Sequence, residues 1–178
     1  MNSSTFETSL QNCYQEMVRF ARSLTRSPMA ADDLLQDSLI RAWRGRKRIE
    51  DPDKFRVWLF TIIRNTFRSQ RRRHWWKRMT GLEAATLLPA ETGLPYEEKE
   101  MVRMALQTLP PIQREAVILF EVVGLSIAEI TQVQHAGESA VKSRLSRGRQ
   151  RLRRAYLRLN DQGDQSCQEQ QKMRLETD

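Results

Sequence analysis

The strongest concentration of chemistry in this sequence is a basic segment in its last third. Between Ser139 and Arg158 eight residues are Lys or Arg and none is Asp or Glu. A helix whose charges only face solvent usually interleaves acids with bases, which pair at i to i+4 spacing. We therefore expect this segment to bind an anionic partner, nucleic acid first among them, rather than to form a merely solvated face.

The apolar residues of this segment indicate which of its polar side chains would read DNA. Val141 and Leu145 mark the buried face, so side chains on the opposite face are placed to reach base edges. These side chains are Lys142, Ser143, Ser146 and Arg147. The arginines from Arg149 to Arg158 are expected to contact phosphates, which supply affinity without reading the base sequence.

A second basic stretch, between Lys54 and Leu82, also contains no acid. It combines basic side chains with aromatic rings and an amide. This mixture suits single-stranded nucleic acid, because unpaired nucleobases stack on aromatic rings. The residues concerned are Arg64, Asn65, Arg68, Arg71 to Arg73, Trp58, Phe67, Trp75 and Trp76. Trp58 and Phe67 are expected first as core residues, whereas Trp75 and Trp76 fit a core or a stacking role equally well.

The sequence offers no catalytic or metal-binding set. Cys13 and Cys167 are far apart, and neither has a Cys or His neighbour at metal-ligand spacing, so both are expected to be free thiols. His74 and His135 are the only histidines. We predict no metal, no cofactor, no small-molecule substrate and no enzymatic activity.

Composition narrows the class of partner further. The chain has 178 residues, a formal net charge of +8 and 29% charged residues, which favours an anionic partner. No run approaches 18 apolar residues, and residues 1 to 11 have neither the basic nor the apolar region of a signal peptide. A cytoplasmic protein that binds nucleic acid is therefore expected.

Helices must position the stretch around Asn65. An apolar face at three- and four-residue steps predicts a helix over 6–24, and Ser27-Pro28 predicts the start of a second over 28–43. A loop over 45–53 precedes a third helix beginning near residue 54. The buried stripe of the second helix is Ala31, Leu34, Leu35, Leu39, Ala42 and Trp43, and its exposed face is Asp33, Gln36, Asp37, Arg41 and Arg44.

The second half predicts a helix-turn-helix. One helix ends at Pro110-Pro111, and the next packs inward through Phe120 and ends at Gly124. Ser126 and Glu129 form a capping box, so a short helix should run over 127–134, followed by a turn over 135–138 and a final helix over 139–158. The predicted fold is all-α, with two small helical domains over 1–79 and 96–159, a flexible linker over 80–95 and a disordered polar tail over 160–178.

Several motifs in this order resemble the extracytoplasmic-function (ECF, group IV) sigma factors of bacterial RNA polymerase. The resemblance covers roughly 6–158 and both expected domains. The motifs run Ala30-Ala-Asp-Asp-Leu-Leu-Gln-Asp-Ser-Leu-Ile-Arg-Ala-Trp43, Trp58-Leu-Phe-Thr-Ile-Ile-Arg-Asn65, Leu109-Pro with Arg114-Glu115, Gly124-Leu-Ser-Ile-Ala-Glu-Ile130 and Val141-Lys-Ser-Arg-Leu145.

The resemblance implies a noncatalytic subunit that directs core polymerase to promoters. The exposed helix face with Asp33, Gln36, Asp37 and Arg41 would dock on the β′ clamp, and the second domain would sit on the β flap. The melted minus-10 element would meet the loop over 47–54 and Lys54, Trp58, Arg64, Asn65, Arg68 and Arg71. The minus-35 duplex would meet Lys142, Ser143, Arg144, Ser146, Arg147 and Arg149. An anti-sigma factor is a further expected partner.

Three positions depart from the family pattern, and two alternative functions stay open. Gln134-His135 replaces the usual Leu-Gly in the turn, Ser139-Ala140 replaces Gly-Thr, and Gly148 stands where Ala is common. One alternative is a helix-turn-helix regulator that acts without polymerase on a palindromic site. The other is a protein that only sequesters an anti-sigma factor, in which charge reversal at Lys142 and Arg147 would leave function intact.

Overall fold

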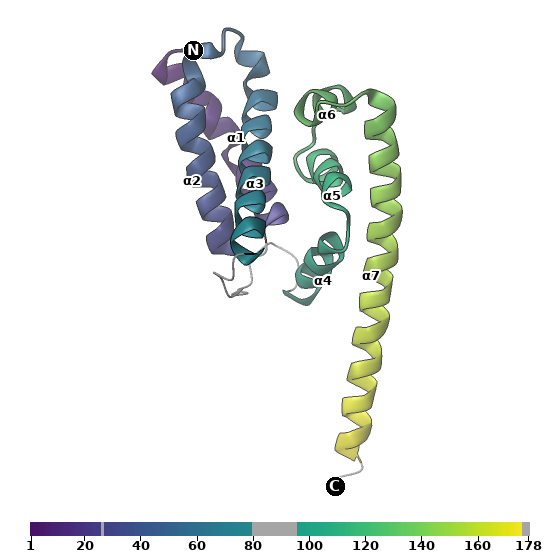
Figure 1. The fold of residues 1–178 in the computed structure, drawn as a ribbon. Helices are drawn as coiled ribbons and strands as arrows, with labels where there is room; N and C mark the ends of the chain where they lie inside the picture. Colours follow the sequence, from purple (N-terminus) through teal and green to yellow (C-terminus); the bar gives the residue numbers. More distant parts are fainter. Residues whose placement is uncertain (26, 80–95, 176–178) are drawn as a thin grey trace.

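The computed structural model describes residues 1–25, 27–79 and 96–175, and every regular element in these ranges is a helix (Figure 1). The predicted all-α class is therefore confirmed. The predicted linker over 80–95 lies outside the described residues. The first domain contains α1 (Ser3–Leu24), α2 (Pro28–Gly45) and α3 (Phe55–Met79); the second contains α4 (Tyr96–Gln107), α5 (Pro111–Val117), α6 (Ile127–Gln134) and α7 (Glu138–Leu175).

Local capping signals start the helices of the first domain. The Asn2 side chain accepts a hydrogen bond from the amide of Thr5 at 2.8 Å and begins α1. The Ser27 hydroxyl accepts one from the amide of Ala30 at 3.2 Å, with Pro28 at the first position of α2. Two 3₁₀ turns, Arg46–Arg48 and Pro52–Lys54, then lead into α3.

Aromatic rings fill the core of this domain. The rings of Phe6 and Phe55 meet edge to face at 5.5 Å, and those of Phe20 and Phe60 at 5.4 Å. Trp43, which we predicted to be buried, is 41% exposed. It lies in the last turns of α2, where its ring and that of Phe6 meet edge to face at 5.5 Å and the Arg46 guanidinium covers the ring at 3.6 Å.

The chain leaves α5 through a wider turn than the sequence predicted. After α5 the π-helical turn η3 (Ile118–Val122) follows, and the amide of Val123 bonds the Ile118 carbonyl at 3.1 Å. Gly124 then takes a φ of 75°, which confirms its predicted place as the residue that ends the helix. Phe120 lies within η3 and is half-buried against the core instead of fully buried.

Helix α7 is longer at both ends than expected. It begins at Glu138, one residue before the predicted start, and continues to Leu175 through the stretch predicted to be a disordered tail. Gln, Glu, Lys, Met and Arg are good helix formers and no Pro interrupts this stretch, so its polarity alone did not indicate disorder. Residues 176–178 lie outside the described part of the chain.

The two domains pack against each other. Helix α3 lies beside α6 (Figure 1), and α1 contacts η3. The buried apolar residues of both domains form one continuous cluster. The described part of the chain contains no helix that is long and apolar enough to cross a membrane.

Candidate nucleic-acid interface

The capping box predicted from the sequence starts α6. The amide of Ser126 donates to a Glu129 carboxylate oxygen at 2.7 Å, and the amide of Glu129 donates to the Ser126 hydroxyl at 3.2 Å. Both bonds are the reciprocal pair of a capping box, so α6 begins at Ile127 and ends at Gln134 as predicted. The first helix of the helix-turn-helix is thereby fixed by local contacts.

The turn between α6 and α7 explains the departure at Gln134-His135. His135 takes the left-handed conformation with a φ of 48°, the role that Gly usually fills at the end of a helix. Gln134 is only 4% exposed. Its amide nitrogen donates to the Ile112 carbonyl at 3.2 Å, and its oxygen accepts from Arg144 at 2.8 Å. This glutamine joins α5, α6 and α7 through polar bonds.

The predicted minus-35 residues occupy different environments on α7. Lys142, Ser146 and Arg147 are exposed, and Ser143 is half-buried. Lys142 also forms an ion pair at 3.1 Å with Glu138, an acid that the sequence analysis had placed outside the helix. Because both partners are more than half exposed, this pair is weak and leaves the lysine accessible to an anion.

Arg144 and Arg149 are engaged by their own domain. Arg144 is half-buried and bonds Gln134, as described above. Arg149 donates to Glu121 at 2.6 Å and lies over the Phe120 ring at 4.9 Å. In this conformation Arg144 positions α7 against α6. The Arg149–Glu121 pair is about half exposed on both sides and therefore weak, so Arg149 stays accessible to an anion along with Lys142, Ser146 and Arg147.

Gly148 allows α7 to pack closely on α5. A Cβ atom built on Gly148 would lie 2.6 Å from Val117 Cγ2 and 3.3 Å from the Gln113 carbonyl oxygen. The first distance is shorter than a normal contact, so alanine would not fit unless the Val117 side chain shifted. The glycine that departs from the family pattern therefore has a steric reason in this chain.

Helix α3 presents a basic face to solvent. Asn65, Arg68 and Arg71 are exposed, while Phe67 is buried in the core with Arg71 at 5.8 Å from its ring. Trp58 is half-buried and lies on the same face of α3 as Asn65, about two turns earlier. Whether Trp75 and Trp76 have a core or a stacking role stays open, because their side chains lie outside the described part of the structure.

An open groove of about 450 Å³ lies beside Trp58. Its walls are the loop before α3, the first turns of α3 and one residue of the second domain, Gln132. Lys54 lines this groove and is exposed, with a 3.5 Å ion pair to Asp51. Part of the predicted base-binding loop and Trp58, which was expected first as a core residue, therefore line one open groove.

Arg64, a predicted minus-10 residue, lies elsewhere. Its side chain is 2% exposed and forms an ion pair at 2.8 Å with Glu115 of α5, which is 3% exposed. A second nitrogen of Arg64 donates to the Val133 carbonyl of α6 at 3.2 Å. In this conformation Arg64 contacts the second domain and is not open to solvent, in contrast to Asn65 beside it.

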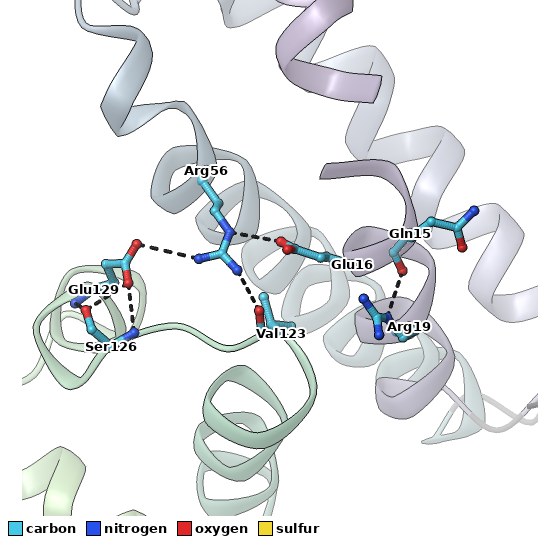
Figure 2. A network of polar contacts seen from close by, with 7 residues as sticks. All are labelled: Gln15, Glu16, Arg19, Arg56, Val123, Ser126 and Glu129. Atoms are coloured by element: carbon cyan, nitrogen blue, oxygen red, sulfur yellow. Dashed lines mark hydrogen bonds and ion pairs between the residues drawn. The ribbon is translucent and has the colours of Figure 1, made fainter. Parts of the chain in front are cut away.

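A second arginine, which the sequence analysis missed, also joins the domains (Figure 2). Arg56 of α3 donates to Glu16 of α1 at 2.9 Å and to the Val123 carbonyl at 2.5 Å, and lies 3.8 Å from Glu129. Partial burial lowers the pKa of the Arg56 guanidinium, but the hydrogen bond to Glu16 and the charges of Glu16 and Glu129 outweigh it, so that the pKa is raised. No sequence pattern links residues this far apart.

The exposed face of α2 matches the prediction in most positions and adds an apolar part. Asp33, Gln36 and Arg41 are exposed, whereas Asp37 is half-buried and accepts a hydrogen bond from Gln70 of α3 at 2.9 Å. The same face carries two exposed apolar side chains. Met29 is 67% exposed and Ile40 is 45% exposed. Met29 and Ile40 are eleven residues apart, so they are single exposed apolar side chains on this charged face and do not by themselves form an apolar patch.

Within the described ranges, no three His, Cys, Asp or Glu side chains lie close enough together to hold a metal ion. Cys13 of α1 is buried in the apolar core, and burial together with the charge of Glu16 raises the pKa of its thiol. The prediction for Cys167 falls on a side chain outside the described part of the chain.

Comparison with known families identifies both domains. The Sigma-70 region 2 family matches residues 10–77, and the Sigma-70, region 4 family matches residues 99–152. The chain is 36% identical over 135 residues to the ECF RNA polymerase sigma factor EcfG of Rhodopseudomonas palustris, covering 75% of each chain. It is 31% identical over 168 residues to SigM of Bacillus subtilis, covering 89% of this chain and 99% of that one.

Solved structures agree with the sequence relatives. The sigma factor RpoE of Bartonella quintana, in complex with the anti-sigma factor NepR, overlaps with a TM-score of 0.73 at 32% identity, covering 84% of this chain and 95% of that one. CnrH, in complex with the cytosolic domain of CnrY, overlaps with a TM-score of 0.64 at 28% identity, covering 85% and 86%.

The chain therefore belongs to the ECF sigma factors of RNA polymerase. As a member of that family it associates with core RNA polymerase and directs transcription initiation from specific promoters.

Proposed function

We propose that the two domains of this sigma factor read the two promoter elements separately, through the exposed surfaces of α7 and α3. The proposal rests on one observation: each surface combines exposed basic side chains with a shape that suits its DNA, a helix face for duplex DNA and a groove for melted DNA. Helix α7 offers a basic helix face for a duplex groove, and α3 offers a groove beside Trp58 for unpaired bases.

For the minus-35 duplex, we assign base reading to Lys142, Ser143, Ser146 and Arg147. They lie in the N-terminal part of α7, just after the turn of the helix-turn-helix. This is the part of a recognition helix whose side chains contact base edges in the major groove. Exposed arginines further along α7, such as Arg153, would contact DNA phosphates. Arg144 keeps its predicted place through the orientation of α7 that its bond to Gln134 maintains, and the exposed Arg149 would contact a phosphate.

For the melted minus-10 element, we assign the groove lined by Lys54 and Trp58, together with Asn65, Arg68 and Arg71. A flipped base in the groove could lie against the Trp58 ring, while the Asn65 amide offers a donor and an acceptor to a base edge. Arg68 and Arg71 supply positive charge along the same helix for the phosphate backbone. Arg64 would join this surface only after leaving Glu115.

For core polymerase, we assign the α2 face with Asp33, Gln36, Asp37 and Arg41 to the β′ clamp, and extend it with Ile40. The second domain would sit on the β flap. We further propose that the chain acts in the cytoplasm as a specificity subunit without catalytic activity of its own. Because RpoE and CnrH were solved with anti-sigma proteins, an anti-sigma factor is a proposed partner here too.

Two arginine variants on one helix test the minus-35 assignment. In transcription with core polymerase, R147A should lose discrimination at one or two minus-35 positions, worth about 1–3 kcal/mol per base contact. The matched variant R153A should weaken all promoters alike and lower the salt dependence of DNA binding by about one ion.

The opposite pattern, in which R147A weakens all promoters alike, would refute the assignment. If duplex DNA binding by the free chain on a palindromic site proved as tight as binding by the polymerase complex, the regulator without polymerase would be favoured instead.

A further inference from the structure

The buried glutamine at the end of α6 makes polar contacts that its position does not require. Gln134 is only 4% exposed, and an apolar side chain would fill the same space without needing hydrogen-bond partners. Both ends of its amide are bonded. The nitrogen donates to the Ile112 carbonyl at 3.2 Å, and the oxygen accepts from Arg144 Nη1 at 2.8 Å. The glutamine therefore fixes the position of one arginine of α7.

This arginine has no counterion within the described part of the chain. Arg144 is half-buried, and the acids whose ion pairs reach α7 are engaged by other residues. Glu138 pairs with Lys142, and Glu121 pairs with Arg149. A neutral amide holds the guanidinium in place without neutralising its charge. A partly buried cation without a counterion is unfavourable, so an anion from outside would be bound favourably.

The guanidinium keeps hydrogen-bond donors for such an anion. Arginine has five N–H donors in one plane, and within the described residues only Nη1 of Arg144 bonds a protein atom. Arg144 lies one turn before Arg147 on the same flank of α7, and it is held where α6 and α7 meet. The first helix of a helix-turn-helix crosses the DNA backbone while the second enters the major groove. The anion expected where the two helices meet is therefore a backbone phosphate.

We propose that Gln134 is a positioning residue for minus-35 DNA: it holds Arg144 so that the remaining guanidinium donors bind a backbone phosphate at the edge of the major groove. The inference rests on the proposed reading of minus-35 DNA by α7 and adds a residue outside the assigned set. A side chain that is already held in its bound orientation loses less freedom on binding. Gln134 therefore strengthens DNA binding without touching DNA, and it does so without choosing between bases.

The test replaces the amide with apolar side chains and measures DNA binding by the polymerase complex. Q134L restores the usual residue of the family and removes the acceptor for Arg144, and Q134M does the same at the length of glutamine. The probe is a duplex that carries only the minus-35 element, measured by fluorescence anisotropy. Both variants should weaken binding about 2- to 12-fold, which corresponds to about 0.5–1.5 kcal/mol for ordering one side chain. The salt dependence of binding should fall by up to about one ion.

A double-mutant cycle separates positioning from a purely structural role. R144A should weaken binding at least as much as Q134L, and Q134L should have no further effect in the R144A background. H135G is the control, because it changes the other departure in the same turn and leaves the amide in place. It should bind the probe with the affinity and salt dependence of the wild type. Urea denaturation of each variant shows that it is folded.

Two results would overturn the inference. One is wild-type binding by Q134L and Q134M. The other is an equal loss from Q134L in both backgrounds with unchanged salt dependence, because the glutamine would then act only through the shape of the turn. In either case the proposed reading of minus-35 DNA still stands if R147A loses discrimination between bases. Uniform weakening of all promoters by R147A would instead refute the proposed function, so the two failures are distinguishable.

Discussion

Single residues that looked anomalous in the sequence have specific contacts in the structure. Gln134 replaces an apolar residue in the turn of the helix-turn-helix, and its amide bonds the Ile112 carbonyl and Arg144. A buried amide that is satisfied on both sides costs little and fixes orientation. The turn thus keeps its shape by polar bonds.

Gly148 supports a prediction about stability. The G148A variant would gain about 1 kcal/mol of helix propensity, but its methyl group would lie 2.6 Å from Val117 Cγ2. Overpacking costs about 1–3 kcal/mol, so we expect a net loss of about 1 kcal/mol in the free energy of unfolding, measured by urea denaturation.

A double-mutant cycle with V117A provides the control. Shortening Val117 removes the clashing methyl, so in the V117A background G148A should become neutral or stabilising. An equal cost of G148A in both backgrounds would show that close packing of α5 and α7 is not the reason for the glycine.

At the scale of elements, the bounds of a helix could be predicted where residues close in sequence set its ends. Ser126 and Glu129 lie three residues apart and cap the same helix, so α6 has its predicted bounds. The exposure of Trp43 and the turn after α5 depend on packing at the ends of helices, which periodicity does not describe. The length of α7 was missed because polar composition was taken for disorder, although its residues favour helix.

Helix α3 supports a prediction about DNA. Asn65 is exposed beside the groove that Trp58 lines, so N65A should weaken binding of the polymerase complex to a forked probe with a single-stranded minus-10 element. Loss of a base contact of about 1–2 kcal/mol corresponds to about 5- to 30-fold in affinity, measured by fluorescence anisotropy.

The control for this variant is N12A, which removes an exposed asparagine from α1. It should bind the forked probe as tightly as the wild type. If N65A loses the same affinity for a probe that carries only the minus-35 duplex, Asn65 does not read the melted element and the α3 assignment is wrong.

At the scale of the molecule, the sequence indicated two domains but not their contact. The motifs that place Asn65 and Arg147 on separate DNA-reading helices are local and could be recognised one by one. The ion-pair partners Arg64 and Glu115 are separated by 51 positions in the sequence. Each lies in a motif that was interpreted only within its own domain, so nothing in the sequence paired the two. Only the tertiary structure shows that a predicted DNA-binding arginine is buried between the domains.

The most direct test of the account is transcription in vitro with purified chain and core RNA polymerase, on promoters obtained by mapping transcript starts after overexpression. We expect initiation at discrete sites that share sequence near positions −10 and −35, and loss of initiation when either element is changed. Core polymerase that fails to bind the chain, or initiation that is indifferent to both elements, would contradict the account.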